Sequence, residues 1–154
     1  MATSTSTSTS TSAISTRPLH TIAGLGYSMN WFFAIGGLSA AEEWNAALYA
    51  STYALLQPME GAFEGFKILS APPASPLSGA LISFQVPDGM VNSEVQAALR
   101  EEFGIVVKLL PDGEGGTELV NNALRVSHHV FNTAADYQAL ANALRTLFEA
   151  RRVA

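Results

Sequence analysis

The sequence predicts an α+β fold, in which two long helices precede a small, antiparallel-leaning sheet packed with further helices. Apolar residues recur at helical spacing before residue 58 and again after residue 133. Short runs rich in β-forming residues, such as 80–86 and 123–127, lie between them and are bounded by turn residues. Hydrophobic residues make up 48% of the 154 positions, which is enough for one domain with a true core.

The N-terminus is a low-complexity tract. Residues 3–12 alternate Thr and Ser, and a segment without apolar side chains cannot offset its own ordering entropy. We therefore expect residues 1–15 to be disordered. The sequence contains no Cys, which fits a reducing compartment, so a cytoplasmic location is expected. The Ser-rich, acid-poor start leaves an organelle transit peptide as the weaker alternative.

A first helix is predicted from the helical spacing of Leu25, Met29 and Phe33. The segment 21–41 carries no charge, but its glycines and polar residues argue against a membrane span. We expect instead a helix buried between packed layers, which ends at Gly36 and Gly37.

A second helix is predicted to open at Ser39, because Ser39 and Glu42 form a capping-box pattern. Its apolar face would include Trp44 and Leu48, and Pro58 would stop it. The two helices together define a helical connecting region, residues 16–57.

The remainder, residues 58–154, is predicted to be a small α+β C-terminal domain. Strands are expected at 66–69, 80–86, 105–110 and 123–127, with a turn-rich loop from Pro111 to Gly116. A helix is expected from Ser93, which forms a capping box with Gln96, to Phe103, with Gly104 at its end. A last helix, capped by Thr133 and Asp136, presents one apolar face made of Tyr137, Leu140, Ala141, Leu144 and Phe148.

The composition narrows the functional classes. The net charge of −5 argues against nucleic-acid partners. Charged residues make up only 14% of the chain, which suggests surface covered by another domain or a partner, and the apolar first helix could provide a surface for association. Adjacent His128 and His129 would point to opposite faces of a strand and could not chelate one ion, so no metal site is expected.

Arg125 is the candidate binding residue. It lies inside a predicted strand, directly before a loop and a capped helix. A guanidinium group in that position can hold a carboxylate through two parallel hydrogen bonds. On spacing alone, a structural salt bridge or a solvated arginine is an equally good interpretation.

Three segments resemble class V enzymes dependent on pyridoxal phosphate (PLP), a family of fold-type I that includes cysteine desulfurases, selenocysteine lyases and isopenicillin-N-epimerase-like proteins. LRVSHHVFNT (124–133) resembles the R-[IV]-S-x-H-x-[YF]-N-T block near the family's C-terminus, and TRPLHTIAGLGYSMNWFFAI (16–35) resembles its G-T-P…G-L-G segment. Between them, ALISFQVPDGMVNSEVQAALREEFGIVVK (80–108) follows the family's order of strand, turn, helix and strand. The resemblance extends from Ser15 to the end of the chain.

The resemblance implies a small C-terminal domain that closes over an amino-acid substrate. It implies that Arg125 binds the substrate α-carboxylate and that Thr16 reaches the PLP phosphate of the neighbouring subunit in a homodimer. His129, Asn132 and Thr133 match positions with structural roles.

The chain also departs from the family pattern. Ser15 stands where a Gly precedes the matched Thr. The family's large domain, which supplies the Schiff-base lysine, has no counterpart before Thr16, and Lys67 and Lys108 match neither the sequence nor the place of that lysine. No catalytic residue is therefore assigned, and the chain alone is expected neither to turn over substrate nor to bind PLP.

Other interpretations remain. The chain could be a stand-alone α+β module that binds a carboxylate or regulates a partner, without PLP. A membrane-anchored domain ranks behind it, and a free-standing enzyme ranks last, since no G-x-S-x-G elbow or phosphate-loop motif is present.

Overall fold

The computed structural model describes residues 18–110 and 122–152. The chain divides into two compact units, Met1–Gly37 and Leu38–Ala154. The predicted boundaries at residues 15 and 57 stay predictions, and the Ser/Thr tract and Thr16 lie outside the described residues.

The first unit contains helix α1, Leu19–Ala34. It ends as predicted, because Gly36 and Gly37 follow it with φ of 113° and 65°, values that favour glycine. None of its residues is buried, so the prediction of a helix between packed layers is not met by this chain. No helix in the described part of the chain is both long and apolar enough to cross a membrane.

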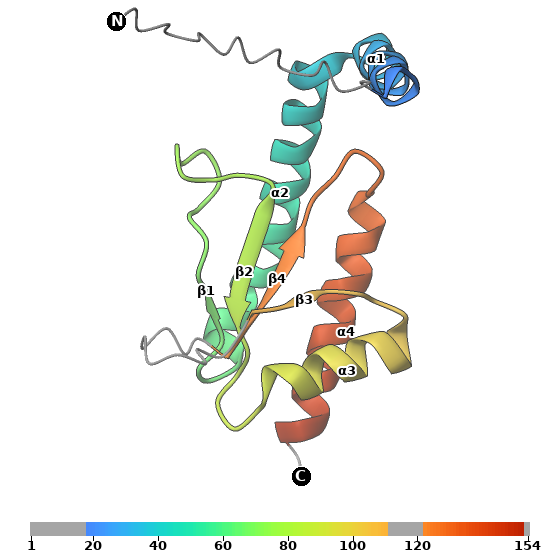
Figure 1. The fold of residues 1–154 in the computed structure, drawn as a ribbon. Helices are drawn as coiled ribbons and strands as arrows, with labels where there is room; N and C mark the ends of the chain where they lie inside the picture. The colour runs from blue at the N-terminus through green and yellow to red at the C-terminus, as the bar shows by residue number, and fades with distance from the viewer. Residues whose placement is uncertain (1–17, 111–121, 153–154) are drawn as a thin grey trace, which may run out of the picture. The chain divides into compact units, whose positions relative to one another are not determined.

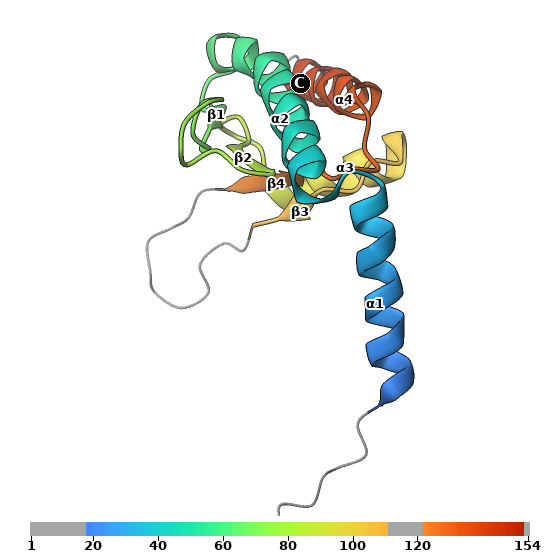
Figure 2. The same cartoon turned by 90° about the horizontal axis from the view of Figure 1, so that it is seen from above.

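The second unit is built on a four-stranded sheet with the order β1-β2-β4-β3, in which every neighbouring pair is antiparallel (Figure 1). Helices α2 and α4 lie on the same side of this sheet, as both views show (Figures 1 and 2). Helix α3 contacts α4, β3 and β4. The predicted α+β class and the antiparallel sheet are confirmed. The bounds are α2 Gly37–Ala62, β1 Lys67–Ile68, β2 Leu81–Gln85, α3 Asn92–Phe103, β3 Lys108–Leu109, β4 Ala123–Ser127 and α4 Ala134–Arg152.

The strand register separates the two faces of the sheet. Successive side chains of a strand point to opposite faces. Leu124 and Val126 of β4 are buried under α2 and α4 together with their partners Phe84 and Ile82 of β2. The residues between these pairs, Arg125 and Ser83, therefore lie on the other, open face of the sheet.

Two predicted helix boundaries are wrong. Helix α2 continues through Pro58 to Ala62, and it begins at Gly37, so Ser39 lies inside the helix rather than at its cap. Proline removes one backbone hydrogen bond from a helix. The next core residues, Met59 and Phe63, are buried, and their burial offsets that loss.

Helix α3 begins at Asn92, so the predicted cap at Ser93 is also wrong. The side chain of Asn122 accepts the Asn92 N–H at 2.7 Å and donates to the Met90 carbonyl at 2.6 Å. The buried Asn92 side chain donates to the carbonyls of Leu110 (3.3 Å) and Ala123 (3.1 Å). The first N–H of α3 is thus accepted by a side chain 30 positions away and not by a local capping box.

The predictions for β4 and α4 are confirmed. Strand β4 has the expected bounds, and the Asp136 carboxylate accepts the Thr133 N–H at 2.8 Å at the start of α4. The predicted apolar face of α4 is buried, and Phe148 lies against Phe63 and Phe66 with ring centroids 5.2 and 5.8 Å apart. Strands β1 and β3 are shorter than predicted.

Candidate functional site

Arg125 occupies the middle of the open sheet face. Its Cα pairs with Ser83 of β2 on one side and with Lys108 of β3 on the other. The residue is half-buried, and its Nε is buried without a hydrogen-bond acceptor among the described residues. Within the described residues, the ion pair that forms joins Arg151 to Glu94 at 2.7 Å. Arg125 takes part in no ion pair there. The salt-bridge interpretation of Arg125 therefore finds no support in residues 18–110 and 122–152.

A groove of about 560 Å³ lies beside Arg125, where β3 begins and β4 continues past it. Its lining comes from residues 105–107, the first residue of β3, the second half of β4, the loop that follows β4 and the first turns of α4. The lining residues that carry hydrogen-bonding or charged side chains are Lys108, Arg125, Ser127, His128, His129, Asn132, Asp136 and Tyr137.

The loop after β4 is held by its own contacts. The Asn132 side chain accepts the His129 N–H at 3.1 Å, and the Asn132 carbonyl accepts the Trp44 indole N–H at 3.2 Å. The His129 ring stacks on Phe131 with centroids 4.4 Å apart. These contacts give the rim of the groove a defined shape beside Arg125.

His128 is the neighbour that sequence analysis left without a role. It is buried whereas His129 is exposed, and both follow Ser127, the last residue of β4. Its Nδ1 lies 3.1 Å from the Ala80 carbonyl, and its Nε2 lies 2.9 Å from the Thr52 hydroxyl. A carbonyl can only accept, so the contact with Ala80 requires a proton on Nδ1. The Thr52 hydroxyl also lies 2.8 Å from the Leu48 carbonyl, and its single proton goes either to that carbonyl or to Nε2 of the neutral ring. Burial lowers the pKa of His128 below 6.5, which favours that neutral form.

Tyr137 completes the inner wall of the groove. Its hydroxyl donates to the Ser127 carbonyl at 3.2 Å, and its ring lies 4.6 Å from that of His128. Burial, with a smaller contribution from the charge of Asp136, raises the pKa of Tyr137 to about 12. The phenol stays protonated at neutral pH and serves as a donor that fixes β4 against α4, not as a base.

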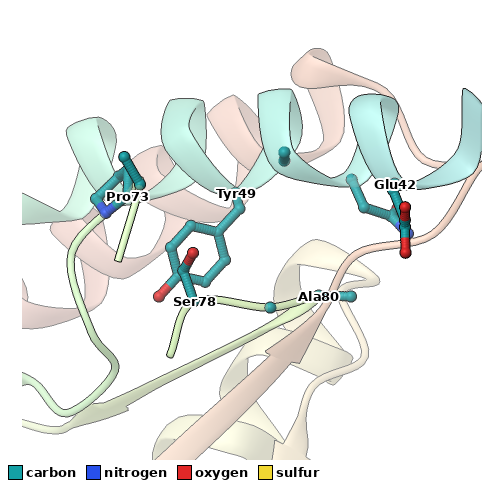
Figure 3. Close-up of a pocket in the computed structure, with 9 residues that line it drawn as sticks. Glu42, Tyr49, Pro73, Ser78 and Ala80 are labelled. Atoms are coloured by element: carbon teal, nitrogen blue, oxygen red, sulfur yellow. The ribbon is translucent and has the colours of Figure 1, made fainter. Parts of the chain in front are cut away.

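A second cavity, of about 430 Å³, lies between α2 and the loop 73–80 (Figure 3). The Tyr49 ring extends from α2 toward the segment that carries Ser78, and Glu42 lies farther along the same helix. The Tyr49 hydroxyl donates to the Ala71 carbonyl and the Ser78 hydroxyl to the Ser75 carbonyl, so both are engaged. None of the residues that line this cavity is a cation that could hold a carboxylate.

The described residues do not form a complete PLP site. Lys67 is exposed on β1 opposite Gln85, and Lys108 is exposed on β3. Thr52, Asn92 and His128 are the buried polar residues of the described part, so it offers no buried carboxylate for a pyridinium nitrogen. Within residues 18–110 and 122–152, no group of three His, Asp or Glu side chains could hold a metal ion. Thr16, the residue predicted to contact the phosphate, lies outside the described residues.

The fold and the groove define an α+β domain in which a half-buried arginine, Arg125, lines a groove and makes no ion pair within the described residues. No protein-family profile matches the chain. A stretch of 78 residues, 49% of the chain, is 38% identical to isopenicillin N epimerase from Amycolatopsis lactamdurans and covers 18% of that enzyme. Among solved structures, a decarboxylase from Sulfurospirillum multivorans matches 64% of the chain with a TM-score of 0.47 and 19% identity, over 24% of its own length. The chain therefore spans about a fifth to a quarter of each of these two proteins.

Proposed function

We propose that this chain is the C-terminal part of a class V PLP-dependent enzyme and that Arg125 binds the α-carboxylate of an amino-acid substrate. The observation that carries the proposal is the half-buried Arg125, whose Nε has no acceptor among the described residues and which faces a groove. The partial identity to isopenicillin N epimerase supports the same family, because epimerases of that kind belong to the class that the sequence resembles.

Binding of a carboxylate by Arg125 is favoured because the hydrogen bonds gained offset the hydration that the guanidinium group has lost. A guanidinium group that is partly withdrawn from water loses hydration, and an unsatisfied donor costs about 1–3 kcal/mol. A carboxylate that accepts two parallel hydrogen bonds from it repays that cost, and charge-assisted bonds of this kind contribute about 1.5–3 kcal/mol. The β4 backbone fixes the Cα of Arg125 beside the groove, and the half-burial of its side chain reduces the rotamer freedom that binding removes.

In this proposal PLP is bound by the whole enzyme and not by the described residues alone. We propose that Thr16 contacts the PLP phosphate of the neighbouring subunit, as the resemblance implies, and that the Schiff-base lysine belongs to a large domain outside this sequence. The placement of Lys67 and Lys108 on the exposed face is consistent with that division.

The test combines the size of the natural product with one substitution. An antibody against α4 should detect a polypeptide several times heavier than 16.3 kDa. In that protein, Arg125→Gln should raise the KM for the amino-acid substrate at least about tenfold, because the bidentate contact is lost. Arg100→Gln, at an exposed arginine on α3, is the matched control and should leave the KM unchanged. Equal KM values for the Arg125 and Arg100 variants would contradict the proposal.

A second candidate is a stand-alone module that binds a carboxylate, or regulates a partner, without PLP. It is favoured by one specific observation: the described residues supply the cation but neither a buried lysine nor a buried carboxylate. It predicts a natural product of 16.3 kDa whose affinity for amino acids is the same with and without PLP.

We further propose that two copies of the chain associate through α1, and that the enzyme is a homodimer. The support is the exposure of large apolar side chains along and just after this helix: Leu19, Ile22, Leu25, Tyr27, Met29, Trp31, Phe33 and Ile35. Light scattering should give twice the monomer mass, and Leu25→Asp with Trp31→Asp should return it to the monomer. A monomeric wild-type protein would overturn this proposal.

A further inference from the structure

Lys108 and Arg125 form a pair of cations on neighbouring strands. Their Cα atoms are register partners in the antiparallel β3–β4 pair, so both side chains leave the same, open face of the sheet. Directly opposed residues of this kind have Cβ atoms about 4.5–5.5 Å apart. Both residues also line the groove of about 560 Å³.

Nothing in the described part of the chain neutralises this pair. Like charges directly opposite one another destabilise a sheet. Asp136 lines the same groove, but its carboxylate accepts the Thr133 N–H at the start of α4 and makes no ion pair with either cation. The sheet therefore carries two adjacent positive charges whose repulsion an anionic ligand would relieve.

The two cations differ in how they can bind. Arg125 is half-buried and planar, and its donors match one carboxylate. Lys108 is exposed on a flexible stem, and its ammonium group offers three further donors. A single carboxylate held by Arg125 would leave the Lys108 ammonium group free for a second anionic group of the same molecule.

We propose that the groove selects amino acids whose side chain carries a negative charge, with Arg125 on the α-carboxylate and Lys108 on the side-chain anion. This inference rests on the proposed function and names the substrate class of the same site. It makes Lys108 a specificity-determining residue with no part in covalent chemistry. Lys67 of β1 is also on the open face, but it pairs with Gln85 of β2, so we expect it to contribute nothing to this selectivity.

The test compares ligands of equal shape and different charge. The full chain would be titrated with L-glutamate and with L-glutamine, and likewise with L-aspartate and L-asparagine, at constant ionic strength, with backbone amide shifts as the readout. We expect one of the acids to bind about three- to fivefold tighter than its amide, the range for an exposed charge pair. Lys108→Gln should abolish that preference without changing the affinity for the amide. Lys67→Gln should retain it.

The outcomes separate this inference from the proposed function. If acid and amide bind equally to the wild-type chain, or if the preference survives in Lys108→Gln, the assignment of Lys108 is wrong while the carboxylate site stands. If none of the four amino acids binds, or if Arg125→Gln binds them as the wild type does, the proposed function fails and this inference falls with it. A folded state for each variant is checked by circular dichroism, because Lys108 and Lys67 are exposed and their replacement should not unfold the chain.

Discussion

Alternate residues of the same strands form the two faces of the sheet: one face packs into the core, and the other carries the candidate site. On the covered face, Phe84 and Leu124 are fully buried beneath α2 and α4 and belong to one continuous core. On the open face, Arg125 is the register partner of Ser83 and Lys108 on the neighbouring strands, and α2 and α4 lie on the other side of the sheet (Figure 2). A shift of β4 by one residue would exchange the two sets. The apolar residues thus fix the register that places the two cations together.

The largest expected effect is on the covered face. Phe148 is fully buried and makes edge and tilted contacts with Phe63 and Phe66. Phe148→Ala should reduce the free energy of unfolding by about 3–5 kcal/mol, the usual cost of removing a buried aromatic ring. Ser83→Ala on the open face should change it by no more than about 0.5 kcal/mol. Urea denaturation measures both, and equal losses would erase the distinction between the two faces.

A smaller, pH-dependent effect is expected at His128, which joins the covered core to the end of β4. Burial lowers its folded-state pKa below 6.5, so the unfolded chain binds more protons under acidic conditions. The stability contributed by the neutral ring is fully present above pH 6.5 and is lost as the pH falls below 6.5 toward the folded-state pKa. The loss should not exceed about 1.4 kcal/mol per pH unit.

The neighbouring histidine supplies the control for that measurement. His128→Gln should flatten the fall in the urea midpoint between about pH 7 and about pH 5, because the titrating ring is gone. His129→Gln should retain the fall, since His129 is exposed at the groove rim. Parallel pH profiles for the wild type and His128→Gln would show that the buried ring is not the source.

The smallest effect is expected from the cation pair itself. Lys108→Gln should raise the free energy of unfolding by about 0.2–0.5 kcal/mol in low salt, because it removes a like-charge pair across β3 and β4. The gain should shrink as added salt screens the wild-type repulsion. Lys67→Gln should produce no such gain, and a destabilised Lys108 variant would mean that its charge is already satisfied in the free chain.

Local patterns sufficed to predict several elements. Strand β4 followed from the alternation of Leu124, Arg125 and Val126, and α4 from the Thr133–Asp136 cap and its apolar face. In both cases the information lies within one turn or one strand. The helix end predicted at Pro58 was wrong. The hydrogen bond lost at Pro58 is a local effect, whereas the burial of Met59 and Phe63, which offsets it, depends on the whole core.

Long-range contacts account for what could not be predicted. The start of α3 depends on Asn122, which is 30 positions away from Asn92, and no local motif reveals that contact. The alternation of Leu124 and Val126 could have assigned His128 to the covered face. It could not have identified Thr52, 76 positions away on α2, as the hydrogen-bond partner of His128.

The sequence predicted one of the two cations of the candidate site. Arg125 was identified from its place in a strand before a loop, whereas its neighbour Lys108 was noted only as a lysine that does not match the Schiff-base position. Their proximity depends on the β3–β4 register, which the sequence between the two strands does not specify. The strand predicted at 105–110 contributes only Lys108 and Leu109 to that pairing.

The most direct test of the central claim observes the Arg125 guanidinium itself. In chain labelled with 15N-arginine, the Nε–H signal assigned through its loss in Arg125→Gln should shift and saturate when L-alanine is added, because a carboxylate bound by the guanidinium group changes the electronic environment of Nε. The signal of Arg100 should stay in place over the same titration. An Arg125 signal that does not move, or one that moves no more than that of Arg100, would contradict the assignment of this groove as a carboxylate site.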